Sequence, residues 1–185
     1  MKKSILLALL ALALPASAGT IDWKLNTLSD NNYMVGSDGN KLSGFAYLVL
    51  TTAYEEATIT KLDDITALAL GGDSLEITDG VNKNLVTTTD SRITPVDGVT
   101  SLSFTVLVYD KVNKSFFASA EKTEKAYQTS GDEFTDPKQI SFTAANLYAT
   151  AAKRGTQEYH PIVPEPSVAL MGLLGLGMLL KRRRA

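Results

Sequence analysis

The sequence predicts a mainly β fold, a small β-sandwich or β-roll of about seven strands with one or two short helices. Residues 101–109, SLSFTVLVY, alternate polar and apolar side chains with the period of a strand. Residues 45–52, FAYLVLTT, are apolar enough for a central strand. Similar runs recur along the chain, and Gly, Asp and Asn residues that favour turns separate them. These patterns predict several short strands around one core.

The expected strands follow one another closely along the chain. They are residues 22–25, 45–52, 75–78, 85–89, 101–109, 115–120 and 139–143. A polar stretch, residues 110–114, separates the fifth strand from the sixth and predicts a hairpin. Asp79 and Gly80 follow the third strand and predict a second hairpin with the fourth strand, closed by a longer loop.

Two segments have the pattern of short helices. Residues 60–70 place Leu62, Ile65 and Leu68 at helical spacing, and two glycines follow to end the helix. Residues 144–154 are rich in alanine, carry two basic residues in the last turn and are followed by a glycine. Both segments are therefore predicted to be helical.

The composition allows a packed core and excludes several kinds of chemistry. The hydrophobic fraction is 44%, which is enough for a folded domain. There is no cysteine, which excludes disulfides, thiol catalysis and thiolate metal sites. Residues 19–163 carry 12 basic and 19 acidic side chains. The resulting net charge of −7 repels a phosphate backbone, so no nucleic-acid binding is expected.

The first eighteen residues have the three parts of a secretory signal peptide. Lys2 and Lys3 form the positive region, and residues 5–14 form a ten-residue apolar stretch that is short for a spanning helix. Ala16 and Ala18 supply the small side chains of a signal-peptidase site. The Sec machinery and signal peptidase are therefore expected partners, with cleavage after Ala18 and export of the body.

The last residues combine a short apolar stretch with a block of cations. Residues 167–180 are apolar, and as a helix these 14 residues would be about 21 Å long, against roughly 30 Å of bilayer hydrocarbon. Four basic side chains follow and should stay on the cytoplasmic side: Lys181, Arg182, Arg183 and Arg184. A short transmembrane helix with the body outside is expected, either as a plain anchor or as part of a sorting signal.

A four-residue motif precedes the apolar stretch. It consists of Val163, Pro164, Glu165 and Pro166. The two prolines fix φ and keep the segment out of a helix, so the motif should be extended at the outer membrane face. With the apolar stretch and the basic block in this order, it closely resembles the PEP-CTERM sorting signal of Gram-negative bacteria.

The resemblance implies a partner and a destination. Proteins with this signal are processed by exosortase, an integral membrane enzyme, so this chain would be its substrate, recognised at Pro164, Glu165 and Pro166. The tail would span the inner membrane transiently, with the body in the periplasm. The mature protein would then reach the outer surface or the extracellular matrix. The family also implies a link to exopolysaccharide and biofilm.

The expected layout has four parts. Residues 1–18 are the signal peptide, residues 19–154 the β-rich passenger domain, residues 155–162 a linker, and residues 163–185 the sorting signal. The passenger is expected to be structural rather than enzymatic, with no catalytic residue, cofactor or metal assigned.

Few side chains in the passenger suggest catalysis. His160 is the only histidine, and its place in the expected linker favours a solvated side chain over a catalytic or zinc-binding one. Adjacent acidic pairs occur at residues 55–56, 63–64 and 132–133. Neighbouring residues of a strand point to opposite faces, so no such pair is itself a glycosidase dyad. A secreted hydrolase whose carboxylates converge only in the fold is the least favoured alternative.

Two kinds of ligand remain open. Residues 37–40 and 79–82 offer oxygen donors that suit calcium, although the same residues are common in simple turns. Aromatic side chains can stack on sugars, which makes a carbohydrate-binding module the alternative to a structural passenger. The candidates are Trp23, Tyr33, Tyr47, Tyr54, Tyr109, Tyr127, Tyr148 and Tyr159.

Overall fold

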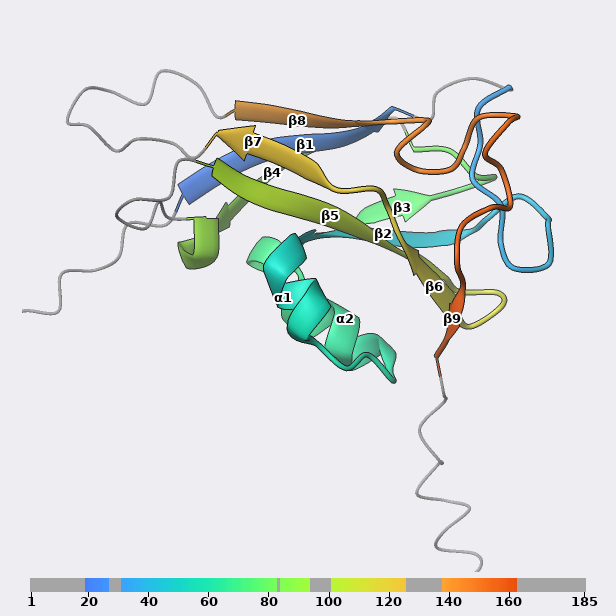
Figure 1. The fold of residues 1–185 in the computed structure, drawn as a ribbon, viewed down its shortest axis with the longest axis horizontal. Coiled ribbons are helices and arrows are strands. Elements are labelled where there is room, and N and C mark those ends of the chain that lie inside the picture. The colour runs from blue at the N-terminus through green and yellow to red at the C-terminus, as the bar shows by residue number, and fades with distance from the viewer. Residues whose placement is uncertain (1–18, 27–30, 83, 94–100, 126–137, 163–185) are drawn as a thin grey trace, which may run out of the picture.

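The computed structural model describes residues 19–26, 31–82, 84–93, 101–125 and 138–162. This part of the chain is mainly β, as predicted, with two short α-helices (Figure 1). The strands are β1 Gly19–Asn26, β2 Gly44–Leu50, β3 Leu75–Ile77, β4 Leu85–Asp90, β5 Ser101–Asp110, β6 Ser115–Ala118, β7 Lys122–Lys125, β8 Lys138–Thr143 and β9 His160–Pro161. The helices are α1 Thr51–Glu56 and α2 Leu62–Leu68, with 3-10 turns η1 Leu70–Gly72 and η2 Ser91–Ile93.

The strands form two sheets. The smaller sheet has the order β4-β1-β8, with β1 antiparallel to β4 and parallel to β8. The larger sheet has the order β3-β2-β5-β6-β9, and β7 pairs with the first half of β5. Its longest ladder joins β2 to β5, from Gly44 opposite Asp110 to Leu50 opposite Phe104. The predicted hairpin of β5 and β6 is confirmed.

The first core lies between the two sheets. Trp23 and Phe142 enter it from the smaller sheet, and Leu48 and Val106 enter it from the larger sheet. All four side chains are buried. Two sheets therefore cover each other's apolar faces, and burial of a large apolar side chain contributes about 1.5–3 kcal/mol relative to exposure.

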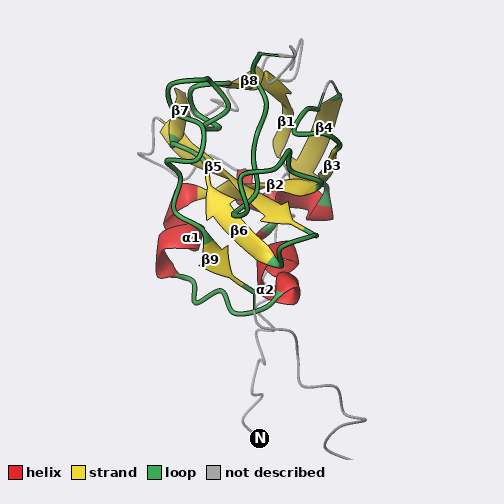
Figure 2. Cartoon of the chain, turned by 90° about the vertical axis from the view of Figure 1, so that its right-hand side faces the viewer, coloured by secondary structure: helices red, strands yellow, loops and turns green. Residues whose placement is uncertain are grey.

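The second core lies on the opposite face of the larger sheet. Val49 of β2 and Leu107 of β5 pack there against Ile65 of α2. Adjacent residues of β2 and β5 thus enter different cores, because successive side chains of a strand point to opposite faces. Figures 1 and 2 show the resulting three layers: the smaller sheet, the larger sheet and the helix pair.

A chain of two hydrogen bonds starts at Trp23 in the first core and leads to Asp73. The indole nitrogen of Trp23 donates to Thr88 Oγ1 at 3.0 Å, and the Thr88 hydroxyl donates to Asp73 Oδ2 at 2.9 Å. Trp23 and Thr88 are fully buried. The hydroxyl of Thr88 therefore satisfies the one polar atom of the tryptophan side chain and joins β1, β4 and the segment after η1.

The second predicted hairpin is wrong. β3 pairs with β2 in the larger sheet, whereas β4 pairs with β1 in the smaller sheet. The turn signal at Asp79 and Gly80 is real, because both residues have positive φ. It closes a local bridge between Thr78 and Val81 and does not bring the two strands together.

The predicted helix at residues 144–154 is also wrong, because this segment forms consecutive turns. Asn146 Oδ1 accepts hydrogen bonds from both the backbone nitrogen and the hydroxyl of Thr143, at 3.1 and 2.6 Å. Tyr148 has a φ of 53°, which no right-handed helix contains. Leu147 is fully buried in the first core, so packing of the turn replaces helix formation.

The predicted helix at residues 60–70 is confirmed in a shorter form as α2, and Gly71 with its φ of 64° follows it.

The strand predicted at residues 45–52 ends earlier than expected. Thr51 instead begins α1, and its buried hydroxyl hydrogen bonds to that of Thr105 at 2.9 Å.

The Trp23–Thr88 contact predicts a specific loss of stability. Thr88→Val keeps the shape of the side chain but leaves the buried indole N–H without an acceptor, which should lower the free energy of unfolding by about 1–3 kcal/mol. Urea unfolding followed by the fluorescence of Trp23, the single tryptophan, measures this change. Thr89→Val, at an exposed position of the same strand, should change it by no more than about 0.5 kcal/mol. Equal losses in both variants would contradict the assignment.

Candidate functional site

The residues that the sequence assigns to export and sorting lie outside the described residues. They are Ala16, Ala18, Val163, Pro164, Glu165, Pro166, Lys181, Arg182, Arg183 and Arg184. Among the helices that the structure describes, none is both long and apolar enough to cross a membrane. The described body extends to Ile162, the residue immediately before the predicted motif.

The C-terminal strand β9 is paired with the body on its way to that motif. It runs antiparallel to β6, with His160 opposite Phe116. Directly after β9, the backbone nitrogen of Ile162 donates to the carbonyl oxygen of Lys114 at 2.7 Å. The Ile162 side chain is buried in the second core. The chain is therefore held to the larger sheet up to the start of the motif.

Residues 155–162 thus differ from the expected linker, because they pack on the body. The buried Gln157 donates through Nε2 to the carbonyl oxygen of Val35 at 3.3 Å, and the Tyr159 hydroxyl donates to the same oxygen at 2.8 Å. The Tyr159 ring meets Phe117 edge-on, with centroids 5.8 Å apart. The sequence predicted a linker here, and the signal that could have indicated packing is the pair of apolar side chains at Tyr159 and Ile162.

A groove of about 450 Å³ lies beside β9. It is lined on one side by Tyr54, Glu55, Ala57, Thr58 and Ile59, and on the other by Phe116 and His160. His160 is half-buried rather than solvated, and its ring lies 5.1 Å from that of Phe116 at an interplanar angle of 33°. Burial, and then the charge of Glu158, raises the pKa of Tyr54. The groove therefore places the rings of Tyr54, Phe116 and His160 beside the exposed carboxylate of Glu55.

The acidic pairs occupy helix ends in the described structure. The pair at residues 55–56 is exposed at the end of α1. In the pair at residues 63–64, Asp64 Oδ2 accepts the backbone N–H groups of Thr60 at 2.8 Å and Lys61 at 3.0 Å. These hydrogen bonds lower the pKa of Asp64. Its carboxylate therefore serves the start of α2, and the third pair, residues 132–133, lies outside the described residues.

The two turns considered for calcium have different surroundings. In the turn after β3, the side chain of Asn82 makes two hydrogen bonds within its own loop. Its Nδ2 donates to the carbonyl oxygen of Glu76, and its Oδ1 accepts the backbone N–H of Asn84. In the other turn, Asp38 accepts hydrogen bonds from the side chain and backbone of Asn40 at 2.9 and 3.0 Å, and these lower the pKa of Asp38. Across the described ranges, no three His, Asp or Glu side chains converge as metal ligands.

The aromatic candidates for sugar stacking are all at least partly covered where the structure describes them. Trp23, Tyr47 and Tyr109 are buried, and Tyr33, Tyr54, Tyr148 and Tyr159 are half-buried. The ring of Tyr33 is covered by the guanidinium of Arg154, 3.4 Å from the ring centroid. Tyr127 lies outside the described residues.

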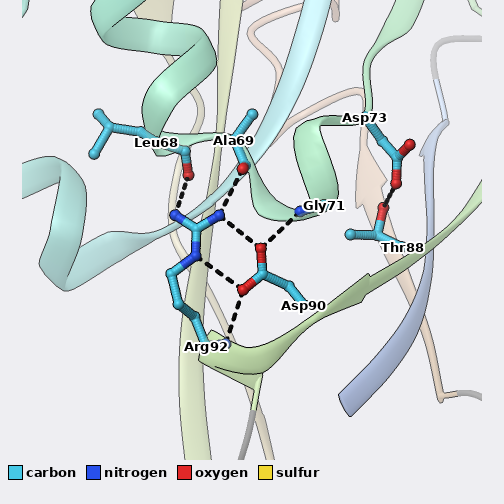
Figure 3. A network of polar contacts seen from close by, with 7 residues as sticks. All are labelled: Leu68, Ala69, Gly71, Asp73, Thr88, Asp90 and Arg92. Atoms are coloured by element: carbon cyan, nitrogen blue, oxygen red, sulfur yellow. Dashed lines mark hydrogen bonds and ion pairs between the residues drawn. The ribbon is translucent and has the colours of Figure 1, made fainter. Parts of the chain in front are cut away.

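A network of charged and polar contacts joins β4 to the end of α2 (Figure 3). Arg92 donates to both carboxylate oxygens of Asp90, from Nε at 2.9 Å and from a terminal nitrogen at 2.6 Å. The same guanidinium donates to the carbonyl oxygens of Leu68 and Ala69 at 3.1 and 2.6 Å. Asp90 Oδ2 also accepts the backbone N–H of Gly71 at 2.8 Å.

This network is structural in character. Four of the five N–H groups of Arg92 are already used within the chain, and the carboxylate of Asp90 is only 11% exposed. The side-chain hydrogen bonds with Arg92 hold the pKa of Asp90 far below its usual range, and those with Asp90 raise the pKa of Arg92. The pair joins the helical layer to the smaller sheet and leaves little capacity for a ligand.

Comparison with known proteins adds no relative to this picture. No protein-family model, no curated protein and no solved structure matches the chain.

Loss of the Arg92 side chain should destabilise the fold. Arg92→Ala removes the guanidinium from Asp90, which keeps only its backbone N–H donors, and leaves the carbonyl oxygens of Leu68 and Ala69 without this donor. The free energy of unfolding should therefore fall by about 1–3 kcal/mol. Urea unfolding measures the change. Lys153→Ala, at an exposed position, is the matched removal of a basic side chain and should cost less than about 0.5 kcal/mol. A loss for Arg92→Ala as small as that for Lys153→Ala would contradict this role.

The lowered pKa of Asp90 also predicts how stability depends on pH. A carboxyl whose pKa is lower in the folded than in the unfolded state contributes stability above its unfolded pKa of about 3.9 and loses that contribution as the pH falls further. The wild type should therefore be more stable than Asp90→Asn at pH 6, and the difference should shrink below about pH 4. Urea unfolding of both proteins from pH 6 to below about pH 3 tests this, and a difference that stays independent of pH over this range would contradict it.

Proposed function

We propose that this protein is an exported passenger that is sorted by a C-terminal PEP-CTERM signal and processed by an exosortase. The passenger would be a small β-sandwich, preceded by a cleaved signal peptide and followed by a short transmembrane helix. Three features in order carry the proposal: the Val163–Pro166 motif, the apolar residues 167–180 and the basic residues 181–184. The body would serve a structural role at the cell surface or in the matrix, in association with exopolysaccharide.

The way in which the body ends supports this proposal. Ile162 is buried and hydrogen-bonded to the β5–β6 turn, and Val163 follows directly. Pro164 and Pro166 have no backbone N–H and cannot extend the antiparallel pairing of β9. The motif would therefore begin directly after the last described residue, Ile162, at one defined point of the passenger surface.

The charges of the chain are consistent with a protein that crosses the inner membrane in this orientation. The cationic block at residues 181–184 would remain on the cytoplasmic side, whereas residues 19–163 carry a net charge of −7. An acidic body does not favour nucleic acid, so the proposed partners are the export machinery, the exosortase and the membrane.

Replacement of the motif tests the proposal directly. A variant with alanine at Pro164, Glu165 and Pro166 should remain in the inner membrane with its C-terminus intact, because exosortase would not recognise it. Cell fractionation and intact-mass measurement in the natural host, with the wild type for comparison, give the result. The wild type should be released to the surface without the peptide that ends in Ala185.

A matched control lies a few residues upstream. Glu158→Ala with Pro161→Ala removes an exposed glutamate and an exposed proline from β9 and its approach but leaves the motif intact. This variant should be sorted like the wild type. Wild-type protein recovered from the surface with its C-terminus intact at Ala185 would refute the sorting proposal.

A further inference from the structure

Two carboxylates from distant parts of the sequence meet beside Gly36. A Cβ atom at Gly36 would collide with Asp110 Oδ2, and it would lie 2.7 Å from Asn113 Nδ2 and 3.1 Å from Asp38 Oδ1. These three polar atoms therefore converge around one point between the loop after β1 and the β5–β6 turn. Only glycine at position 36 leaves this space open, which explains its presence in a buried position.

Asp110 is a buried carboxylate with neutral partners. Asp110 as a whole residue is only 2% exposed. Oδ1 accepts the backbone N–H groups of Val112 and Asn113 at 2.9 and 3.1 Å, and Oδ2 accepts Asn113 Nδ2 at 2.7 Å. Within the described ranges, neither Asp110 nor Asp38 forms an ion pair with Lys or Arg. Buried carboxylates are normally paired with a cation or bound to a metal, so a positive partner is expected here.

A buried hydroxyl without a partner points to the same place. Ser115 is 5% exposed, and its Oγ makes no hydrogen bond. In the β5–β6 ladder Ser115 lies directly opposite Asp110, so the two side chains project from the same face with Cβ atoms about 4.5–5.5 Å apart. Because buried hydroxyl groups are nearly always satisfied, this oxygen indicates a ligand beside the Asp110 carboxylate.

The field of the two carboxylates reaches a nearby phenol. Burial, and then the charges of Asp110 and Asp38, raises the pKa of Tyr159 to about 12. The negative charges of the buried Asp110 and the exposed Asp38 therefore act on the same group, and a cation bound between them would neutralise both.

We propose that Asp38, Asp110, Asn113 and Ser115 form a binding site for Ca²⁺. Calcium takes six to eight oxygen ligands in flexible geometry and accepts carboxylate, amide, hydroxyl, carbonyl and water oxygens together. The side-chain amide of Asn113 presents its oxygen in place of its nitrogen when it turns by 180°, and these two atoms are assigned only from their hydrogen bonds. Mg²⁺ is disfavoured because it requires a smaller and more regular octahedral site.

Two carboxylates set the expected affinity. Calcium sites with few charged ligands in extracellular modules have dissociation constants of about 10⁻⁴–10⁻³ M. A site of this kind would be empty at low calcium and filled in a calcium-rich medium. The proposal does not depend on the proposed sorting function.

The position of the site links calcium to the end of the body. The β5–β6 turn that carries Asn113 also carries the carbonyl oxygen of Lys114, which accepts the backbone N–H of Ile162 at 2.7 Å. Ser115 is the register partner of Pro161 in β9. Calcium bound to this turn would therefore hold both sides of the hairpin in place and stabilise the attachment of β9.

Calorimetric titration of the purified full chain with CaCl₂ tests the proposal. The wild type should bind one Ca²⁺ with a dissociation constant of about 10⁻⁴–10⁻³ M and should melt at a higher temperature in its presence. Asp38→Asn removes one charged ligand from an exposed loop and should weaken binding by about tenfold or more. Ser115→Ala should also weaken binding, without a loss of folding in calcium-free buffer. Hydrogen exchange at the Ile162 amide should slow when calcium is added.

Asp79→Asn is the matched control, because Asp79 is exposed in the other Asp-Gly turn of the described body. This variant should bind calcium like the wild type. The proposal is overturned if the wild type shows neither binding heat nor a melting shift up to about 10 mM Ca²⁺, well above the expected dissociation constant. It is equally overturned if Asp79→Asn loses as much affinity as Asp38→Asn, or if Mg²⁺ binds as tightly as Ca²⁺.

Discussion

The pairing of β2 with β5 is the constraint on which the rest of the structure depends. The ladder runs from Gly44 opposite Asp110 to Leu50 opposite Phe104, and both faces of the two strands are covered. One face binds the smaller sheet, and the other binds the helix pair. A shift of one residue would exchange the two faces, because side chains alternate along a strand. The register of this pair therefore determines which side chains enter each core.

The same ladder positions the chemistry at the end of the body. β5 ends at Asp110, the turn that follows carries Asn113, and β6 returns to pair with β9. The buried carboxylate, the hydroxyl of Ser115 and the last hydrogen bond before the motif thus belong to one hairpin and its neighbour. The contact between Arg92 and Asp90 has a different function, because it joins the helical layer to the smaller sheet.

Sequence patterns predicted the strands better than their partners. The alternation in residues 101–109 and the apolar run in residues 45–52 identify β5 and β2 because burial imposes a pattern on neighbouring residues. Turn chemistry was less informative, since the residues around Asp79 close a small local bridge while β3 and β4 join different sheets. The alanine-rich residues 144–154 favour a helix intrinsically. In the fold, however, Asn146 accepts a hydrogen bond from the hydroxyl of Thr143, and Leu147 packs in the first core.

The sequence by itself determined the features that depend on local composition: the mainly β character, the lack of thiol chemistry, and the terminal segments on which export and sorting are proposed. The tertiary structure alone decided the features that depend on contacts between distant residues. It paired β9 with β6 in a segment expected to be a linker, and it brought Asp38 to Asp110 beside Gly36. The physical reason is that long-range pairing depends on the packing of the whole chain, whereas periodicity reports only how one segment is buried.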